Sequence, residues 1–421
     1  MNGDVRITVS WGVCFYGSCL EARFIVNLSN NTQLNYLEEA AILPEKEPVH
    51  VMHIMSEFGG GISSFIMNKA ESLAGSNVVF DVVTFEEPSE RFRQAIEGTG
   101  GQVYQVPNPV KKSLPQCLRQ TNQIMKSKPK DTIIYCHYGM DLALLFYLLA
   151  KWNRLEFIIH AHTADPAGNN NFRRRLNTWM SDRQASCGLG ATENIFGEAS
   201  AREGSVVHIP NSIRVENFLQ PSKAAATSKK LEVYGPENEG KFMIGQIGRF
   251  HVVKNHGFSL DIIEQLTKQA NFAFQWVFIG EGELEEQVKQ QVKDRGLENY
   301  VKFLGRREDV AELYQTLDVI VLPSHFEGLS TVAIEAQASG VVSLLSDVQT
   351  RETDLGLKLV EFLPIEEASI WADAIMAHYH QPVTVTPEER LAQFAAKKFT
   401  NPASAELYEA FLRGEVKEYQ I

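Results

Sequence analysis

Short apolar runs alternate with longer amphipathic segments between about residues 49 and 400. The apolar runs predict strands at 49–55, 78–85, 132–137, 157–162, 206–209, 241–247, 273–279, 301–304, 319–322 and 341–345. Helical patterns lie between most of these strands, for example at 284–295 and at 311–316. Alternation of this kind predicts an α/β protein whose parallel sheets are covered by helices on both faces.

The length of 421 residues predicts two domains of about 200 residues each. The boundary is expected in a polar stretch with Pro and Gly that separates two strand–helix series. We therefore predict an N-terminal domain at 48–220, a linker at 221–240 and a C-terminal domain at 241–402. Ligands of open parallel sheets bind beyond the carboxyl ends of the strands, so we expect the functional site in the cleft between the domains.

Residues 1–47 do not join this pattern. They hold a strand-like run at 5–9 and an Asn-rich polar stretch, followed by Pro44 and Pro48. We interpret them as an N-terminal extension, which is either an appended element or a partly disordered segment.

The composition is that of a globular enzyme. A net charge of −12 argues against a nucleic-acid binder, which needs a basic surface. The chain has no uncharged apolar run of the roughly 18 residues that a spanning helix requires.

The five cysteines are scattered, and Cys14 and Cys19 lack a second pair or nearby histidines, which argues against a zinc site. Reduced thiols in a cytoplasmic protein are the simpler interpretation.

Two cations, Arg249 and Lys254, follow the predicted strand at 241–247. Arginine offers a planar fork of donors and lysine a point charge, which together suit a diphosphate whose negative charge grows as it departs. The alternative is a solvated basic loop, but two cations at the carboxyl end of one strand favour the phosphate site.

Two glycine-rich turns also follow predicted strands. Gly60 and Gly61 lie between the strand at 49–55 and the next helix, where glycine lets backbone amides approach a phosphate. Gly280 and Gly282 follow a later strand, where their backbone would line a nucleotide pocket. In both places a tight turn without a ligand explains the glycines equally well.

Two carboxylates, Glu327 and Glu335, flank a step from an apolar strand into a helix. If the helix begins near Leu329, Glu335 lies about two turns inside it, so the carboxylates address different parts of one extended ligand. The amides of Gly328, Leu329 and Ser330 are then unpaired donors that suit a diphosphate. The alternative is a capping acid and a surface glutamate. The apolar neighbours of Glu335 favour a ligand, since they predict a buried helix where an unpartnered carboxylate is costly.

A histidine, His162, ends the predicted strand at 157–162 on the cleft side of the N-terminal domain. Its imidazole is placed to hydrogen-bond a sugar or its developing charge. His160 is more simply a satisfied core histidine, and His137 ends another strand in a similar place.

One predicted helix has an amphipathic face that suits a membrane surface. Phe172, Leu176 and Trp179 share this face, beside an arginine triplet. Such a face can rest on an anionic membrane surface. A core face next to a solvated basic face is the more common arrangement.

These motifs, in this order, resemble the retaining glycosyltransferase family 4, whose members have the two-domain GT-B fold. The matching elements are His50 to Gly61, His162-Thr163, Ile209 to Ile213 with Phe218, Arg249 with Lys254, Gly280-x-Gly282 and Glu327-x7-Glu335. The resemblance spans about residues 48 to 400 and is closest to bacterial exopolysaccharide and capsule transferases. It implies two Rossmann-like, doubly wound domains that face a central cleft, with 403–421 as a helix that crosses back to the N-terminal domain.

The resemblance also implies a role for each matching position. Arg249 and Lys254 would hold the donor diphosphate, Glu335 the ribose, and Glu327 the hydroxyls of the transferred sugar. The amides of Gly328, Leu329 and Ser330 would contact the distal phosphate, and Gly280 and Gly282 would line the nucleotide pocket. His162 would lie near the donor sugar, and Gly60 and Gly61 near the phosphates and the acceptor.

Two features depart from the family pattern. Asn211-Ser212-Ile213-Arg214 stands where the family usually has Asn-Gly-Ile-Asp, and the N-terminal extension lies outside the pattern. The chain has no Asp-x-Asp motif. This agrees with a metal-independent enzyme that needs no cofactor beyond its nucleotide-sugar substrate.

The sequence therefore predicts a cytoplasmic retaining hexosyltransferase that uses a nucleotide sugar, most simply a UDP-sugar. The expected acceptor is a glycan or a lipid-linked oligosaccharide in surface polysaccharide synthesis, with peripheral contact at the inner face of the plasma membrane. Two alternatives are a non-catalytic sugar-nucleotide- or glycan-binding partner of another transferase, and a nucleotide-sugar epimerase on the same fold. The presence of both cations and both glutamates favours catalysis, because degenerate sites usually lose one of them.

Overall fold

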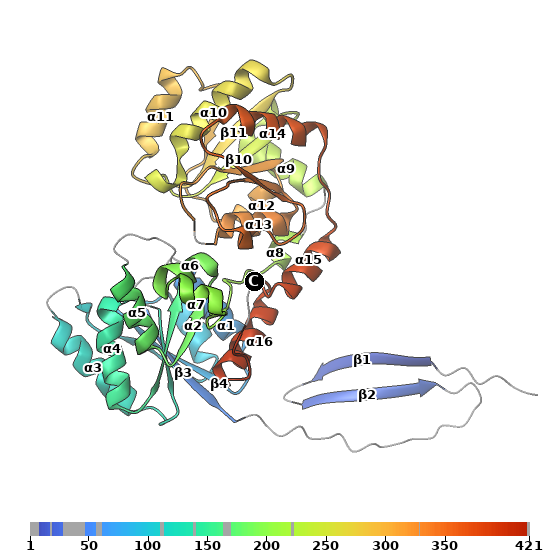
Figure 1. The fold of residues 1–421 in the computed structure, drawn as a ribbon. Coiled ribbons are helices and arrows are strands. Elements are labelled where there is room, and N and C mark those ends of the chain that lie inside the picture. Colours follow the sequence, from blue (N-terminus) through green and yellow to red (C-terminus); the bar gives the residue numbers. More distant parts are fainter. Residues whose placement is uncertain are drawn as a thin grey trace, which may run out of the picture.

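The computed structural model describes residues 8–16, 19–27, 47–55, 61–109, 113–137, 140–162, 170–219, 223–327 and 329–418. Within these residues the chain forms two α/β domains, each built on one parallel sheet with helices packed against it (Figure 1). The predicted fold class of two Rossmann-like, doubly wound domains is confirmed.

The N-terminal domain has a seven-stranded parallel sheet in the order β5-β4-β3-β6-β7-β8-β9. The strands are β3 (Val49–Met55), β4 (Val78–Thr84), β5 (Val103–Gln105), β6 (Ile133–Cys136), β7 (Glu156–Ala161), β8 (Arg183–Ser186) and β9 (Val207–His208). The helices are α1 (Gly61–Ser72), α2 (Glu90–Glu97), α3 (Leu114–Lys126), α4 (Met140–Trp152), α5 (Asn171–Met180), α6 (Leu189–Ile195), α7 (Glu198–Glu203) and the last helix, α16 (Asn401–Leu412). Each face of the sheet has its own core: α1, α2 and α16 cover one face, and α3 to α6 cover the other.

The C-terminal domain has a six-stranded parallel sheet in the order β12-β11-β10-β13-β14-β15. The strands are β10 (Phe242–Ile247), β11 (Phe274–Ile279), β12 (Val301–Phe303), β13 (Val319–Leu322), β14 (Val342–Ser346) and β15 (Val360–Leu363). The helices are α8 (Glu216–Leu219), α9 (Lys223–Tyr234), α10 (His256–Gln269), α11 (Glu285–Asp294), α12 (Val310–Tyr314), α13 (Thr331–Ser339), α14 (Ala368–His380) and α15 (Pro387–Ala396), with 3-10 turns η2 (Pro236–Asn238), η3 (Val252–Lys254) and η4 (Arg351–Thr353).

Both sheets reverse their strand order beside their first strand. In the N-terminal sheet β3 lies between β4 and β6, and in the C-terminal sheet β10 lies between β11 and β13. At such a switch point the connections leave toward opposite faces, which opens a crevice at the carboxyl ends of the two strands. The two switch points are therefore the places where ligand-binding side chains are expected.

The strands of the two parallel sheets that sequence patterns missed are short or partly polar. They are β5, β8 and β15. Strands β5 and β15 are sheet edges and are only partly buried, and β8 begins with the polar pair Arg183-Gln184. By contrast, all six residues of β11 are buried, which produces the continuous apolar run that pattern analysis detects.

The chain crosses between the domains twice, and the two crossing segments touch. Ile213 forms a parallel β-bridge with Thr400, and its N–H donates to the carbonyl of Phe399 at 3.0 Å. Val215 already belongs to the C-terminal core, so packing places the first crossing before the predicted boundary at 220. After the second crossing, α16 packs on α1 of the N-terminal domain (Figure 1).

Two expectations for irregular segments need correction. The segment 221–240, interpreted as a linker, contains helix α9, and the Tyr234 hydroxyl at its end is 2.9 Å from Thr316 in the C-terminal domain. The polar sequence of α9 is that of a surface helix, which explains why it resembles a linker. In the N-terminal extension, β1 (Thr8–Tyr16) and β2 (Cys19–Asn27) form an antiparallel hairpin rather than a single short strand at 5–9.

The described helices include none that is long and apolar enough to cross a bilayer.

Candidate functional site

The C-terminal switch point brings together the two loops that carry the predicted diphosphate site. Strands β10 and β13 are parallel neighbours, so the loops that follow them leave the same edge of the sheet. The N–H of His325 donates to the carbonyl of Val253 at 2.8 Å, and the Gln246 side chain donates to the carbonyl of Lys254 at 2.9 Å. The bond from His325 holds the β13 loop against the β10 loop, and the bond from Gln246 fixes the β10 loop to its own strand.

Lys254 and Glu327 form an ion pair at this switch point. The side chains are 20 % and 15 % exposed, and the Ser324 hydroxyl donates to the same Glu327 oxygen at 3.0 Å. Arg249 lies at the edge of the loop with 71 % of its side chain exposed, 3.3 Å from Glu283. The site thus has one cation in a partly buried ion pair and one in an exposed ion pair with Glu283.

Gly280 and Gly282 are required by close packing of this loop. A Cβ on Gly280 would lie 2.0 Å from the carbonyl oxygen of Gly248, and Gly280 has a φ of +143°. A Cβ on Gly282 would lie 2.5 Å from the carbonyl oxygen of Phe250. The glycines therefore let the turn after β11 lie directly against the loop that carries Arg249, so packing alone explains them.

Helix α13 begins at Thr331, two residues later than we expected, because Leu329 and Ser330 are still extended or bent. Glu335 therefore lies little more than one turn into the helix. It accepts a hydrogen bond from the Tyr314 hydroxyl at 2.8 Å, and burial raises its pKa. Gly328 lies outside the described residues.

Ser330 is the N-cap of α13, but its side chain makes no capping hydrogen bond. Its hydroxyl is buried and has no hydrogen-bond partner among the described residues. A buried hydroxyl without a partner is costly, so it marks a place where a ligand oxygen would be accommodated. The first-turn amides of α13 point to the same end of the helix.

A cavity of about 540 Å³ lies between the two domains beside Glu327. Its N-terminal wall is formed by α6 and α7, with Arg174 of α5, and its C-terminal wall includes Phe326, Glu327 and the segment 347–352. A cavity of this volume, lined by both domains and by Glu327 of the ion pair, is the size of a small-molecule site.

Glu352 also joins the two domains directly. One oxygen of its carboxylate accepts from the N–H of Leu189, and the other lies 3.0 Å from Nδ1 of His208. Because Leu189 and His208 belong to the N-terminal domain, Glu352 fixes one edge of the cavity.

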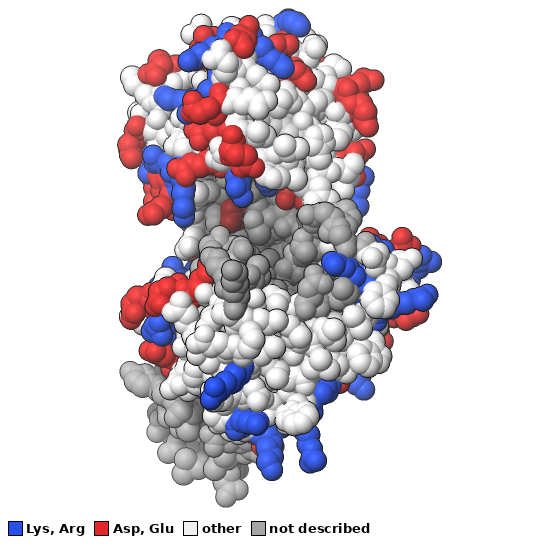
Figure 2. Space-filling model, turned by 90° about the vertical axis from the view of Figure 1, so that its left-hand side faces the viewer, with Lys and Arg blue, Asp and Glu red and all other residues white. Residues whose placement is uncertain are grey.

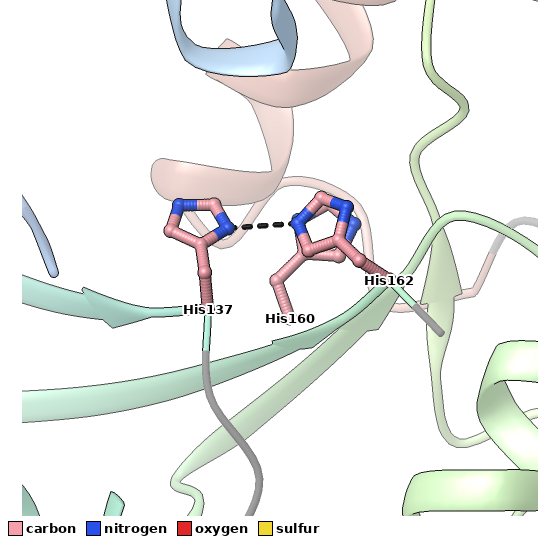
Figure 3. Close-up of side chains that lie close together, drawn as sticks. All are labelled: His137, His160 and His162. Atoms are coloured by element: carbon pink, nitrogen blue, oxygen red, sulfur yellow. Dashed lines mark hydrogen bonds between the residues drawn. The ribbon is translucent and has the colours of Figure 1, made fainter. Parts of the chain in front are cut away.

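The N-terminal switch point carries histidines instead of charges (Figure 3). His162 follows β7, and its Nε2 is 2.8 Å from Nδ1 of His137, which follows β6. On its other side, Nε2 of His137 is 2.8 Å from Nδ1 of His53 within β3, and Nε2 of His53 is 3.0 Å from the Tyr408 hydroxyl. Burial lowers the pKa of His53 and of His162 to about 3, so both are neutral near pH 7.

His160 lies beside this row, with its Nδ1 3.0 Å from the Tyr135 hydroxyl. It is buried, as the sequence analysis expected of a core histidine. His137, His160 and His162 offer nitrogens within 4.8 Å of one another, a spacing at which a metal ion could be held. In the structure, however, Nδ1 of His137 and Nε2 of His162 are already partners of each other at 2.8 Å.

Lys69 is a buried side chain that the sequence analysis missed. Its Nζ donates to the hydroxyls of Ser212 and Ser404 at 3.0 and 2.6 Å, and it lies 4.7 Å from the centre of the Phe65 ring. Burial lowers the pKa of Lys69 to about 7. Ser212 is part of the tetrapeptide that departs from the family pattern, so the departure supplies an acceptor for this lysine.

Of the predicted glycine turn at the N-terminal switch point, only Gly61 is described, and Gly60 lies outside the described residues. Gly61 begins α1, and a Cβ there would lie 3.2 Å from the side-chain nitrogen of Asn211. Among the described residues, the partners of His162 lie in the N-terminal domain, whereas Arg249, Lys254 and Glu327 have theirs in the C-terminal domain. The two groups face the same interdomain region from different sheets.

Comparison with known proteins agrees with this geometry. Residues 228–353 match the family model "Glycosyl transferases group 1". This range includes both cations, both glutamates and the two C-terminal glycines of the site. The chain contains a glycosyltransferase group 1 domain.

Relatives of this glycosyltransferase extend the match over both domains. The "Putative glycosyltransferase EpsF" of Bacillus subtilis (strain 168) is 29 % identical over 335 residues, which are 77 % of this chain and 86 % of that protein. The Escherichia coli "UDP-Gal:alpha-D-GlcNAc-diphosphoundecaprenol alpha-1,3-galactosyltransferase" is 28 % identical over 145 residues, 33 % of this chain and 36 % of that protein.

Solved structures match the same two-domain arrangement. Anabaena Alr3699/HepE in complex with UDP superposes with a TM-score of 0.70 at 17 % identity, covering 87 % of this chain and 100 % of that chain. A glycosyltransferase from Rickettsia africae ESF-5 gives a TM-score of 0.71 at 15 % identity, covering 88 % and 99 %. At such low identity these structures show the fold, which is GT-B.

Proposed function

We propose that this glycosyltransferase is a retaining hexosyltransferase that uses a UDP-sugar. The observation that carries the proposal is the partly buried ion pair of Lys254 with Glu327 at the switch point of the C-terminal sheet, where Glu327 lines an interdomain cavity. At this position the cation suits the diphosphate of a nucleotide sugar, and the carboxylate suits the hydroxyls of its sugar. The named complexes of HepE with UDP and with UDP-glucose support the choice of nucleotide.

In the proposed reaction the bond between the anomeric carbon and the diphosphate oxygen breaks. A new bond forms on the same face between that carbon and the acceptor hydroxyl oxygen, and the hydroxyl proton passes to the departing phosphate. Lys254 and Arg249 stabilise the negative charge that grows on the diphosphate. Since these two side chains supply positive charge, we propose that the enzyme needs neither a metal nor another cofactor.

We assign the remaining donor contacts to the start and first turns of α13. The first-turn amides and the Ser330 hydroxyl would contact the distal phosphate, and Glu335 would bind the ribose hydroxyls. Glu327 would contact hydroxyls of the transferred sugar. Glu335 already has one partner in Tyr314, which leaves its second oxygen for a hydroxyl.

We propose that the acceptor is a polyisoprenyl-diphosphate-linked saccharide in polysaccharide synthesis. The name of the Escherichia coli relative specifies a diphosphoundecaprenol acceptor, and other relatives are named for amylovoran and capsular polysaccharide biosynthesis. The acceptor saccharide would enter between the domains, with His162 and Gly61 on the N-terminal side.

A lipid-linked acceptor implies contact with a membrane, and the N-terminal domain has a suitable face. Trp152, Phe172 and Trp179 are 79 %, 70 % and 66 % exposed on α4 and α5, and Leu148 lies one turn before Trp152. Leu176, which we had placed on the same face, packs partly on the core. Figure 2 shows this side of the domain, where Lys and Arg stand along the lower margin of a broad uncharged area. We propose that this face rests on the inner leaflet.

The proposal is tested by binding and transfer. The full chain is mixed with UDP, GDP or ADP and with the corresponding glucose nucleotides, first without acceptor and without metal, and thermal unfolding is followed. Transfer of radiolabelled sugar to polyisoprenyl-diphosphate-linked N-acetylglucosamine is measured next. Stabilisation by UDP and its sugars together with transfer is expected. Stabilisation without transfer or donor hydrolysis would favour a non-catalytic binder, and conversion of the donor to an epimer would favour an epimerase.

A further inference from the structure

Four side chains from distant parts of the chain form one continuous row of hydrogen bonds. The Tyr408 hydroxyl of α16 is 3.0 Å from Nε2 of His53, and Nδ1 of His53 is 2.8 Å from Nε2 of His137. Nδ1 of His137 is 2.8 Å from Nε2 of His162, the contact drawn in Figure 3. The row leads from the C-terminal helix through the centre of the sheet to the carboxyl end of β7, where the cleft-facing loops leave the N-terminal domain.

Each histidine in the row is neutral, so all the hydrogen bonds of the row must be donated in the same direction. His53 and His137 are buried, and desolvation holds the pKa of His137 well below its usual value, as it does for its two neighbours. A neutral imidazole has one N–H donor and one acceptor nitrogen. If one histidine donates toward the cleft, every histidine in the row must do so.

The Tyr408 hydroxyl determines the direction in which these hydrogen bonds are donated. Its hydroxyl has no other hydrogen-bond partner among the described residues, so its proton is satisfied only by donation to His53. His53 then donates from Nδ1 to His137, and His137 donates from Nδ1 to His162. The reverse direction would leave the buried Tyr408 O–H without an acceptor.

His162 consequently carries its proton on Nδ1. That nitrogen is buried and has no partner among the described residues. We propose that Tyr408, His53 and His137 are positioning residues that hold His162 in this tautomer, so that it presents an N–H donor to an oxygen of the transferred sugar. The identity of the ligand rests on the proposed function, whereas the tautomer does not.

This assignment also gives α16 a role in the site. Tyr408 is 355 residues from His53 in sequence, and it reaches the row because α16 returns to the N-terminal domain after the second crossing. Phe65 of α1 packs edge-on against the rings of His137 and His162, at centroid distances of 5.9 and 5.5 Å, and so limits their rotation.

The first test reads the tautomer directly. Ring ¹⁵N shifts of the full-length protein with labelled histidine distinguish protonated from unprotonated nitrogens, and the variant His162→Asn identifies the His162 signals. We expect a protonated Nδ1 and an unprotonated Nε2. A protonated Nε2 in the wild-type protein overturns the proposal. So does stoichiometric Zn²⁺ binding that changes the His137, His160 and His162 signals together, because it would make the cluster a metal site.

The second test removes the hydroxyl that fixes the direction of hydrogen-bond donation along the row. Tyr408→Phe removes only the hydroxyl, so both tautomers of His162 become populated and the turnover number should fall about threefold to tenfold, the range that one net hydrogen bond can impose. The Michaelis constant for the donor should change little. The control is Tyr135→Phe, which removes a buried hydroxyl that bonds His160 outside the row and should leave both the His162 shifts and turnover unchanged.

Failure of the tautomer proposal can be distinguished from failure of the proposed function. If Tyr408→Phe leaves the His162 shifts as in the wild type, the row does not set the tautomer and the proposal fails, whatever the activity. If the shifts change as expected but no nucleotide sugar is used, the positioning of His162 stands and the proposed function fails.

Discussion

The two sheets reverse strand order in the same way, but the side chains after their central strands differ in charge. At the C-terminal switch point Lys254 and Glu327 form an ion pair, and Glu327 lines a cavity. At the N-terminal switch point His53, His137 and His162 form a buried neutral row. One topology thus supports an ionic site and a neutral site that face the same interdomain region.

The difference in charge agrees with the ligands that we propose for the two sites. A departing diphosphate carries growing charge, which ionised side chains stabilise. A sugar hydroxyl is neutral, and a neutral imidazole donates to it without placing a buried charge in the domain. Burial is the physical variable that separates the sites, since it lowers the pKa of every histidine in the row.

The largest expected effect comes from removing the ionic site. Lys254→Ala should lower sugar transfer by about 10- to 1000-fold, because the diphosphate loses a cation and Glu327 loses its partner. Arg249→Ala should lower it by more than about tenfold. Transfer rates and thermal unfolding are measured together, with Lys289→Ala as the control because it removes a lysine paired with Glu285 and Glu286 on the surface. Near-normal turnover of Lys254→Ala would contradict the role that we propose for Lys254 in stabilising the diphosphate.

The glycines at the two switch points should differ in their tolerance of a methyl group. Gly280→Ala should lower the free energy of unfolding by about 3 kcal/mol, because it combines a φ of +143° with a Cβ 2.0 Å from the Gly248 carbonyl oxygen. Gly61→Ala should cost less than about 1 kcal/mol, since the nearest atom is the end of the Asn211 side chain. Urea unfolding of both variants checks this. Equal losses would contradict the packing argument.

The buried lysine of the N-terminal domain should make stability depend on pH. The pKa of Lys69 is about 7 in the folded protein against 10.5 for the free side chain, so between these values the unfolded chain binds a proton that the folded one lacks. The free energy of unfolding should therefore rise with pH, by at most about 1.4 kcal/mol per pH unit above pH 7. Lys69→Met should remove this slope, and Lys126→Met, which changes an exposed lysine, should keep it. Urea unfolding at pH 7, 8 and 9 measures it, and equal slopes in wild type and Lys69→Met would refute the assignment.

The smallest effect is expected at the proposed membrane face, which belongs to the N-terminal domain alone. Trp152→Ser should weaken binding to vesicles containing phosphatidylglycerol by roughly fivefold to tenfold, because it removes an exposed apolar side chain that would enter the interface. Leu391→Ser changes an exposed apolar residue of the C-terminal domain and should leave vesicle binding unchanged. Vesicle sedimentation compares them, and equal binding by all three proteins would remove this surface from the proposal.

Sequence patterns located the ionic site because its residues follow strands that are buried along all or nearly all of their length. Arg249 and Lys254 lie just after β10, and Glu327 lies just after β13, so strand prediction alone placed them at one edge of a sheet. The start of α13 was predicted two residues too early, since no residue in the run marks where the extended segment ends. The neutral site was found only in part, as His162 and, on weaker evidence, His137, because a histidine inside an apolar strand such as His53 has no local signature of function.

The amino-acid sequence by itself determined the two parallel-sheet domains and the order of the ionic motifs, because strand burial and turn residues are local properties. Tertiary structure decided which side chains meet. It paired Lys254 with Glu327 across a switch point, buried Lys69 between Ser212 and Ser404, and brought Tyr408 to His53. These contacts join residues separated by 73 to 355 positions, and their energies depend on burial that only the packed domains provide.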